Sequence, residues 1–181
     1  MIPGEDACCI LLYGDIGEYS DVTAAAIVRE LMEAEASGKR IDVRINSNGG
    51  DVYTGIAIFN ALRGSKADIH IYVDGIAASM ASVIALCGKP VEMSKYARLM
   101  LHSVSGGCYG NKTELRRCLE EVEALENTLC EMYAPKLGTS VEDIRARYFD
   151  DADHWLKADE ALALGFIDGV YDADNMARAA C

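Results

Sequence analysis

The chain has 181 residues, half of them apolar, and a formal net charge of −12. This length and composition are typical of one domain with a sizeable core, so we expect a single domain over residues 1–181. The negative charge argues against a nucleic acid held by a basic surface. No apolar stretch reaches the roughly 18 residues of a membrane helix, and the N-terminus lacks the basic residues of a signal peptide. We therefore expect a cytoplasmic protein without nucleic-acid or membrane partners.

The first half of the chain alternates strand patterns with helix patterns. Apolar runs and period-two alternation predict strands at 7–14, 41–45 and 68–73, the last ended by Asp74 and Gly75. Amphipathic or wholly apolar spacing predicts helices at 20–37, 51–63 and 76–86. Ser20 is the expected N-cap of the first helix, and Gly38 should end it.

The second half contains the longest predicted helix, 111–137, which opens on Asn111 and Glu114 in a capping-box arrangement and ends at Gly138. Its apolar face consists of Leu115, Leu119, Val122, Leu125, Leu129 and Met132. Short strands are predicted at 91–93, 99–101 and 167–171, and short helices from 140 and over 157–164. Such alternation predicts βαβ crossovers and a mostly parallel sheet. Active sites in such sheets lie beyond the carboxyl ends of the strands.

A glycine turn follows one predicted strand in the run Ile45-Asn46-Ser47-Asn48-Gly49-Gly50. Two glycines let backbone N–H groups approach a ligand closely, and they precede a helix whose N-terminus favours negative charge. The run suits half of an oxyanion hole or a phosphate loop, although no Walker motif follows. A plain tight turn explains the same run.

A serine follows the next predicted strand in Gly75-Ile76-Ala77-Ala78-Ser79-Met80. A lone serine at a helix start is usually an N-cap or bonds to its own backbone. The alternative is a nucleophile beside the Met80 N–H, which would point at a developing oxyanion.

A serine nucleophile needs a base, and the base needs an orienting acid. His102 directly follows an apolar strand, whereas His70 alternates along a strand face and His154 lies in a polar segment. The candidate acids precede Trp155 and are Asp150, Asp151 and Asp153. The seven cysteines show no zinc or redox spacing and are mostly inside periodic segments, including Cys118, so we expect reduced, buried thiols.

Taken together, these segments resemble the proteolytic subunit of the Clp protease over residues 10–171. The glycine turn is similar to the family's Ile-Asn-Ser-Pro-Gly-Gly, 75–80 to its nucleophile motif, 99–102 to its histidine strand and 155–168 to its closing helix. The resemblance implies the α/β fold shared by Clp proteases and crotonases, an αβ-spiral of repeated βαβ units. Residues 111–137 would form its long handle helix.

The resemblance also assigns the site. Ser79 is the expected nucleophile and His102 the general base. Asp153 is the expected acid because it stands two residues before Trp155, with the other two aspartates as rivals. The oxyanion N–H groups would belong to Gly50 and Met80. Acyl transfer of this kind needs no metal or organic cofactor.

The implied protein is a serine endopeptidase that cleaves peptides or unfolded proteins inside a homo-oligomer of seven-membered rings, stacked in pairs. Residues 51–55 and 74–79 are most similar to the short phage and prophage head-maturation branch. The family's N-terminal pore-loop segment is expected to be missing, which leaves a Clp-type ATPase partner open. Asn48 replaces the family's usual proline. Lys157 replaces Ser or Thr, which should remove a capping box from the last helix.

Two other functions stay open on the same fold. A crotonase-type acyl-CoA enzyme would use a backbone oxyanion hole without a serine nucleophile, and a catalytically silent ring subunit would use neither. The set of Ser79, His102 and Asp153 argues against both. The sequence does not indicate the natural substrate.

Overall fold

The structure, a computed structural model, describes residues 2–3 and 7–172. The chain forms two compact units. The first consists of Met1–Met100 and Trp155–Cys181, and the second of Leu101–His154.

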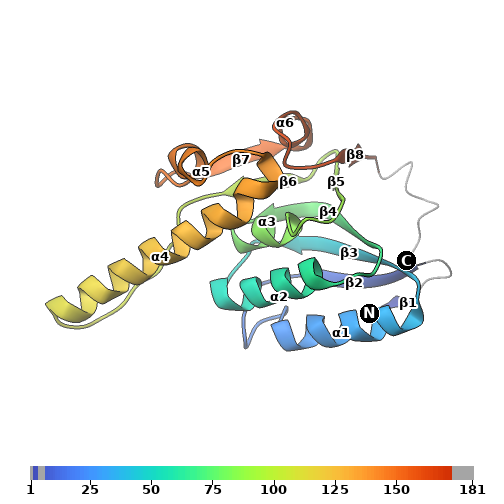
Figure 1. Cartoon of the computed structure of the whole chain (residues 1–181), viewed down its shortest axis with the longest axis horizontal. Helices are drawn as coiled ribbons and strands as arrows, with labels where there is room; N and C mark the ends of the chain where they lie inside the picture. Colours follow the sequence, from blue (N-terminus) through green and yellow to red (C-terminus); the bar gives the residue numbers. More distant parts are fainter. Residues whose placement is uncertain (1, 4–6, 173–181) are drawn as a thin grey trace. The chain divides into compact units, whose positions relative to one another are not determined.

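The first unit is built on a parallel sheet with the strand order β1-β2-β3-β4-β5-β8 (Figure 1). The strands of this path are β1 (Ile2–Pro3), β2 (Ala7–Tyr13), β3 (Arg40–Ser47), β4 (Ile69–Ala78), β5 (Val91–Ser94) and β8 (Gly169–Tyr171). From β2 to β8 the neighbours pair in parallel, and β1 joins β2 antiparallel. Two further strands lie off this path: β6 (Arg98–Leu101) pairs with the end of β4, and β7 (His154–Lys157) pairs with β6.

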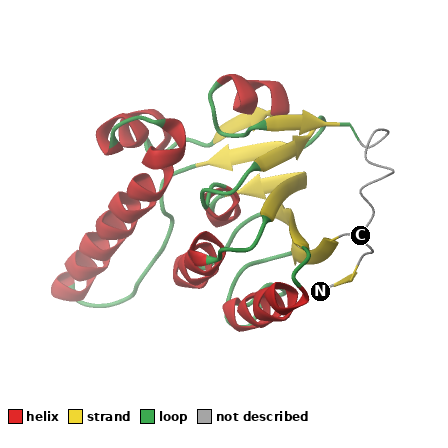
Figure 2. Ribbon diagram, turned by 45° about the vertical axis from the view of Figure 1, so that its right-hand side comes forward, coloured by secondary structure: helices red, strands yellow, loops and turns green. Residues whose placement is uncertain are grey.

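Three helices lie on one face of this sheet (Figures 1 and 2). They are α1 (Ala24–Ser37), α2 (Val52–Gly64) and α3 (Met80–Ala85). Alternate residues of the central strands point to the same face because side chains alternate along a strand. The core between the layers includes the fully buried side chains of Ile41, Val43, Ile45, Ile71, Val73, Ile58, Leu62 and Ile84. A fourth helix, α6 (Ala158–Ala163), follows β7.

The predicted end of β4 at Asp74 and Gly75 is wrong, because the strand continues to Ala78. Its last residues pair with β6, in a register that sets Ile76 opposite Arg98 and Ala78 opposite Met100. This second partner strand supplies backbone hydrogen bonds that a helix would otherwise have to provide. Consequently α3 begins only at Met80, and the predicted helix over 76–86 is shortened at its start.

Other predicted boundaries also shift. Helix α1 begins after Thr23, whose side chain accepts a hydrogen bond from the Ala26 N–H at 3.1 Å, so Ser20 is not the N-cap. Strand β7 was not predicted at all. The last helix keeps half of a capping box, since a Glu160 carboxylate oxygen accepts from the Lys157 N–H at 2.8 Å. The Lys157 side chain makes no capping hydrogen bond, so the predicted loss of a capping box holds for that half only.

The second unit contains α4 (Lys112–Leu137) and α5 (Val141–Tyr148). Both helices start as predicted, α4 with a complete capping box between Asn111 and Glu114, and α5 with Ser140 as N-cap. The end of α4 is buried against α5, where the Tyr133 and Phe149 rings meet edge to face with centroids 6.1 Å apart. The predicted apolar face of α4 is thus buried only in its last turns.

The predicted α/β class and the parallel sheet of repeated βαβ units are confirmed. The assignment of residues 1–181 to a single domain stays a prediction. Within residues 2–3 and 7–172, no helix has the length and apolar composition needed to cross a membrane.

Candidate active site

Ser79 lies at the sharp turn from β4 into α3. Its backbone has φ 52° and ψ −126°, a conformation that residues with a side chain rarely adopt. The Ser79 N–H donates to the Met100 carbonyl of β6 at 2.9 Å, and the Ser79 carbonyl accepts from the Ser82 N–H at 3.0 Å. Its side chain makes no capping hydrogen bond to α3. A strained strand-to-helix turn of this kind presents the serine hydroxyl to substrate in α/β-hydrolases.

The glycine turn packs directly on this serine. Gly49 has φ +95°, and a Cβ there would lie 2.7 Å from the Ala78 carbonyl oxygen and 2.9 Å from the Met80 nitrogen. Gly50 has φ +144°, and a Cβ there would lie 2.1 Å from the Ile16 carbonyl oxygen. Only glycine fits both positions, because the left-handed backbone and the close contacts each exclude a side chain. The structure therefore places Gly49 against the Ser79 turn, and Gly50 follows Gly49 in the chain.

Two backbone N–H groups near Ser79 are available to a ligand. Met80 is the first residue of α3, so its N–H has no acceptor within the helix. Gly50 stands just before Asp51, the N-cap of α2. In the part of the chain that the structure describes, neither N–H donates a hydrogen bond. The pair has the chemistry of an oxyanion hole, in which backbone donors face a developing negative charge.

His102 and Asp153 come together in the second unit. The His102 Nδ1 lies 3.6 Å from the nearer Asp153 carboxylate oxygen, with the side chains 26% and 59% exposed. This distance exceeds that of a hydrogen bond, and the contact is an ion pair only when the imidazole is protonated. The arrangement directs one ring nitrogen of the histidine at the acid.

The two rival acids have other partners. Asp150 Oδ1 lies 2.7 Å from His154 Nε2, and this hydrogen bond holds the pKa of Asp150 below its usual value. Asp151 has φ 66° and donates its backbone N–H to the Ser103 hydroxyl at 3.0 Å. Of the three aspartates, Asp153 is the one whose carboxylate the structure pairs with His102.

A polar cluster that the sequence reading missed lies on β4, before Ser79. Asp74 accepts hydrogen bonds from the Arg44 guanidinium, from the Tyr13 hydroxyl at 2.6 Å and from the Tyr171 hydroxyl. Burial and the Asp74 hydrogen bond raise the pKa of Tyr13 to about 12, and the same causes raise the pKa of Tyr171. The cluster ties β2, β3, β4 and β8 together. One pattern in the sequence could have indicated this cluster. Tyr72 and Asp74 continue the period-two alternation of the strand, which places both side chains on the same face.

The described residues include six cysteines, all of them reduced thiols. Cys8, Cys9, Cys87 and Cys130 are buried as predicted, while Cys118 is half-buried and Cys108 exposed. Burial raises the pKa of Cys87 and of Cys130 to about 11, which keeps both thiols protonated and unreactive. Within residues 2–3 and 7–172, no group of three or more His, Cys, Asp or Glu side chains could hold a metal ion.

Comparison with known proteins identifies relatives. The family model for Clp protease matches residues 7–174. A protein from Bacteroides fragilis named ATP-dependent Clp protease proteolytic subunit is 32% identical over 157 residues, which cover 84% of this chain and 75% of the relative. A protein of the same name from a second strain of that species is also 32% identical, with 70% of its length covered.

Proposed function

The chain belongs to the Clp protease family, and from that premise we propose that it is a serine endopeptidase with Ser79 as its nucleophile. The observation that carries the proposal is the Ser79 turn. There, a non-glycine residue at positive φ stands beside two backbone N–H groups that have no other acceptor in the described chain. Neither a helix cap nor a plain turn requires this combination.

In the proposed reaction, the Ser79 hydroxyl attacks the carbonyl carbon of a peptide bond. His102 takes the serine proton and then gives it to the leaving amine, while Asp153 stabilises the imidazolium. Since Nδ1 faces Asp153, we assign Nε2 as the proton acceptor. The N–H groups of Gly50 and Met80 bind the oxyanion. Water then hydrolyses the acyl-enzyme by the same route, and no cofactor takes part.

Chain connectivity supports pairing the serine with the histidine. The Ser79 N–H is bonded to Met100, and His102 follows Met100 by two residues. Two residues span about 7 Å at most. The backbone of His102 is therefore no farther than that from Met100, whose carbonyl accepts the Ser79 N–H.

We further propose that the chain works as a homo-oligomer of heptameric rings, stacked in pairs, which encloses the sites in a chamber. In the first half of α4, Leu115 and Leu119 are 49% and 59% exposed. They lie four residues apart, on one face of the helix. Exposed apolar pairs of this kind favour burial against another copy. Light scattering of the wild type and of Leu119→Asp tests this, because only the variant should dissociate.

The proposed setting is the cytoplasm, in head maturation of a phage or prophage or in Clp-type degradation of unfolded proteins. The two roles differ in their need for an ATPase. Casein degradation with and without a Clp-type ATPase separates them, because only the second role predicts stimulation.

A fluorophosphonate probe tests the nucleophile directly. We expect mass spectrometry to find the label on Ser79, and Ser79→Ala to lose both the label and peptidase activity, by roughly 10⁶-fold in kcat. Ser82→Ala is the matched control, because Ser82 is a buried neighbour that donates its hydroxyl to the Ser79 carbonyl at 2.6 Å. Absence of labelling in folded, assembled protein would favour a crotonase-type or silent subunit and contradict the proposal.

A further inference from the structure

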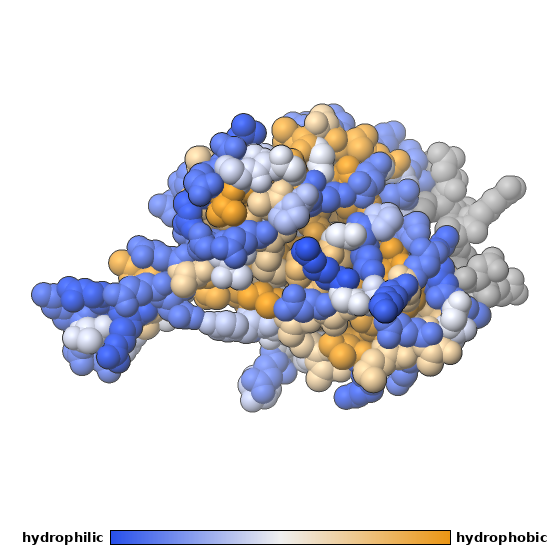
Figure 3. Space-filling view, viewed as in Figure 1, coloured by the Kyte–Doolittle hydropathy of each residue, from blue (hydrophilic) through white to orange (hydrophobic). Residues whose placement is uncertain are grey.

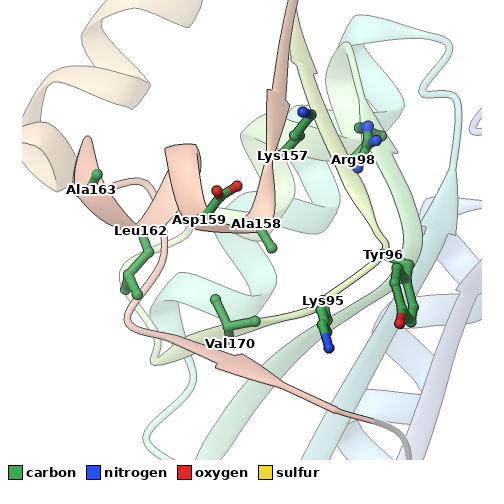
Figure 4. A pocket seen from close by; sticks show the side chains of 9 residues that line it. All are labelled: Lys95, Tyr96, Arg98, Lys157, Ala158, Asp159, Leu162, Ala163 and Val170. Carbon is green, nitrogen blue, oxygen red and sulfur yellow. The ribbon is translucent and has the colours of Figure 1, made fainter.

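A cavity in the first unit shares no residue with the candidate active site. Its volume is about 680 Å³, within the range of small-ligand and peptide pockets. The β5–β6 connection with the start of β6, the β7–α6 segment and β8 form its walls (Figure 4). The lining residues are Lys95, Tyr96, Arg98, Lys157, Ala158, Asp159, Leu162, Ala163 and Val170.

The lining is positively charged, in contrast to the chain as a whole. The lining contains three basic residues, Lys95, Arg98 and Lys157, and one acidic residue, Asp159. In the whole chain, by contrast, 29 acidic residues outnumber 17 basic ones. Lys95 lies 3.5 Å from an Asp172 carboxylate oxygen. In the described part of the chain, neither Arg98 nor Lys157 forms an ion pair with a carboxylate. These two cations are therefore available to an acidic ligand.

Apolar side chains form the rest of the wall. Leu162 and Val170 are 43% and 41% exposed, although both belong to residue types that normally bury their side chains. Figure 3 shows hydrophobic residues gathered on the surface over α6. In Figure 4, Lys157 and Arg98 lie toward one end of the cavity, and Lys95 and Tyr96 toward the other, with Val170 and Leu162 to one side. A ligand for this wall needs carboxylates and an apolar group together.

The position of β8 favours a peptide over a small anion. This strand is last in the order of the sheet, so within the described residues its outer backbone edge is unpaired. An open edge offers N–H and C=O groups to an extended chain, and neighbouring pockets then select its side chains. Val170 of β8 belongs to the cavity wall, so the edge and the cavity are adjacent.

We propose that this cavity binds an extended acidic peptide segment of another protein. An apolar side chain of the peptide packs against Leu162 and Val170, and its carboxylates pair with Arg98 and Lys157. The proposal does not depend on catalysis at Ser79.

Fluorescence anisotropy tests the proposal with the full chain carrying Ser79→Ala, which keeps the probe intact. The probe is a labelled peptide in which leucines are flanked by aspartates. We expect saturable binding that Arg98→Gln and Lys157→Gln each weaken by roughly two- to fivefold, the range for partly exposed ion pairs. Leu162→Ala should weaken this peptide but leave a peptide with serine in place of leucine unaffected.

The matched control is Arg29→Gln with Lys66→Gln, which makes the same charge change at exposed positions outside the cavity. It should bind the probe like the parent. An equal loss in this control, or equal binding of the serine peptide, would show a general charge effect and overturn the proposal. So would no binding by folded protein. If Arg98→Gln with Lys157→Gln dissociates the oligomer but leaves peptide binding unchanged, the cavity is an interface between copies and the proposal is wrong.

Discussion

The Ser79 half and the His102 half of the candidate site are held by different kinds of contact. Backbone hydrogen bonds to β6, a glycine turn without room for a Cβ and buried neighbours fix Ser79. In the other half, His102 Nδ1 lies 3.6 Å from the carboxylate of Asp153, whose side chain is 59% exposed. The first half is therefore preset by the folding of the sheet, whereas the second can be adjusted by a single side-chain rotation.

This difference predicts how substitutions in each half affect stability and activity. A substitution in the first half should disturb the backbone and lower stability as well as activity. A substitution in the second half should change activity while the fold stays intact, because exposed side chains contribute little to stability.

After loss of the nucleophile itself, the largest effect is expected from Asp153→Asn. An amide cannot stabilise the imidazolium and favours the wrong tautomer of His102, so kcat should fall by up to about 10⁴-fold. The denaturation midpoint should change little, since the side chain is mostly exposed. Peptide hydrolysis and urea unfolding of the same samples measure both quantities.

Asp150→Asn and Asp151→Asn are the controls for that experiment. Both should retain most of the activity, because the carboxylate of Asp150 pairs with His154. If Asp150→Asn abolishes hydrolysis while Asp153→Asn is active, Asp153 is not the acid of the site.

Gly49→Ala should disturb the first half. The new Cβ would meet the Ala78 carbonyl and the Met80 nitrogen at under 3.0 Å, and the backbone is at φ +95°. Displacing the neighbouring Gly50 or Met80 N–H from the oxyanion should cost up to roughly 10²- to 10³-fold in kcat, and the strain should lower the denaturation midpoint as well. Gly64→Ala is the control, because a Cβ at Gly64 has nothing within 4 Å. If folded Gly49→Ala has an unchanged kcat, the glycine turn does not help to bind the oxyanion.

The same difference explains how much the sequence could predict. Ser79, His102 and the glycine turn were located from short motifs that each follow a predicted strand, although the end of β4 itself was placed too early. The acid was ambiguous because three aspartates lie close together in the sequence. Only the fold shows that one of them is paired with His154 and another with His102.

The extension of β4 could not be predicted from local pattern. Residues 75–78 are small or apolar on every side, which fits a buried helix as well as a strand. Their pairing with β6 decides the matter, and that pairing joins segments far apart in the sequence. The Arg44–Asp74 pair was missed for the same reason, since its members lie 30 residues apart on neighbouring strands.

The first half should also depend on Asp74, whose strand leads to Ser79. Asp74→Asn leaves the partly buried Arg44 without a carboxylate, so the free energy of unfolding should fall by about 1.5–3 kcal/mol. Urea denaturation at one protein concentration measures this. Asp68→Asn is the control, because Asp68 is 72% exposed and should change stability little. Equal stability of the two variants would mean that the cluster does not support the strand.

The smallest effect is expected from Tyr13→Phe, and it depends on pH. The pKa of Tyr13 is raised from 10.0 to about 12, so the folded chain holds the phenol proton more tightly than the unfolded chain. The stability from this group is therefore fully present below about pH 10 and is lost as the pH rises through about 12. The wild type should exceed Tyr13→Phe by about 0.5–1.5 kcal/mol near neutral pH, and the difference should shrink between pH 10 and 12. Tyr19→Phe should match the wild type throughout, because Tyr19 is 94% exposed. If the difference in the free energy of unfolding between the wild type and Tyr13→Phe does not change with pH, it comes from packing of the ring. The Tyr13 hydroxyl would then not stabilise the strand that leads to Ser79.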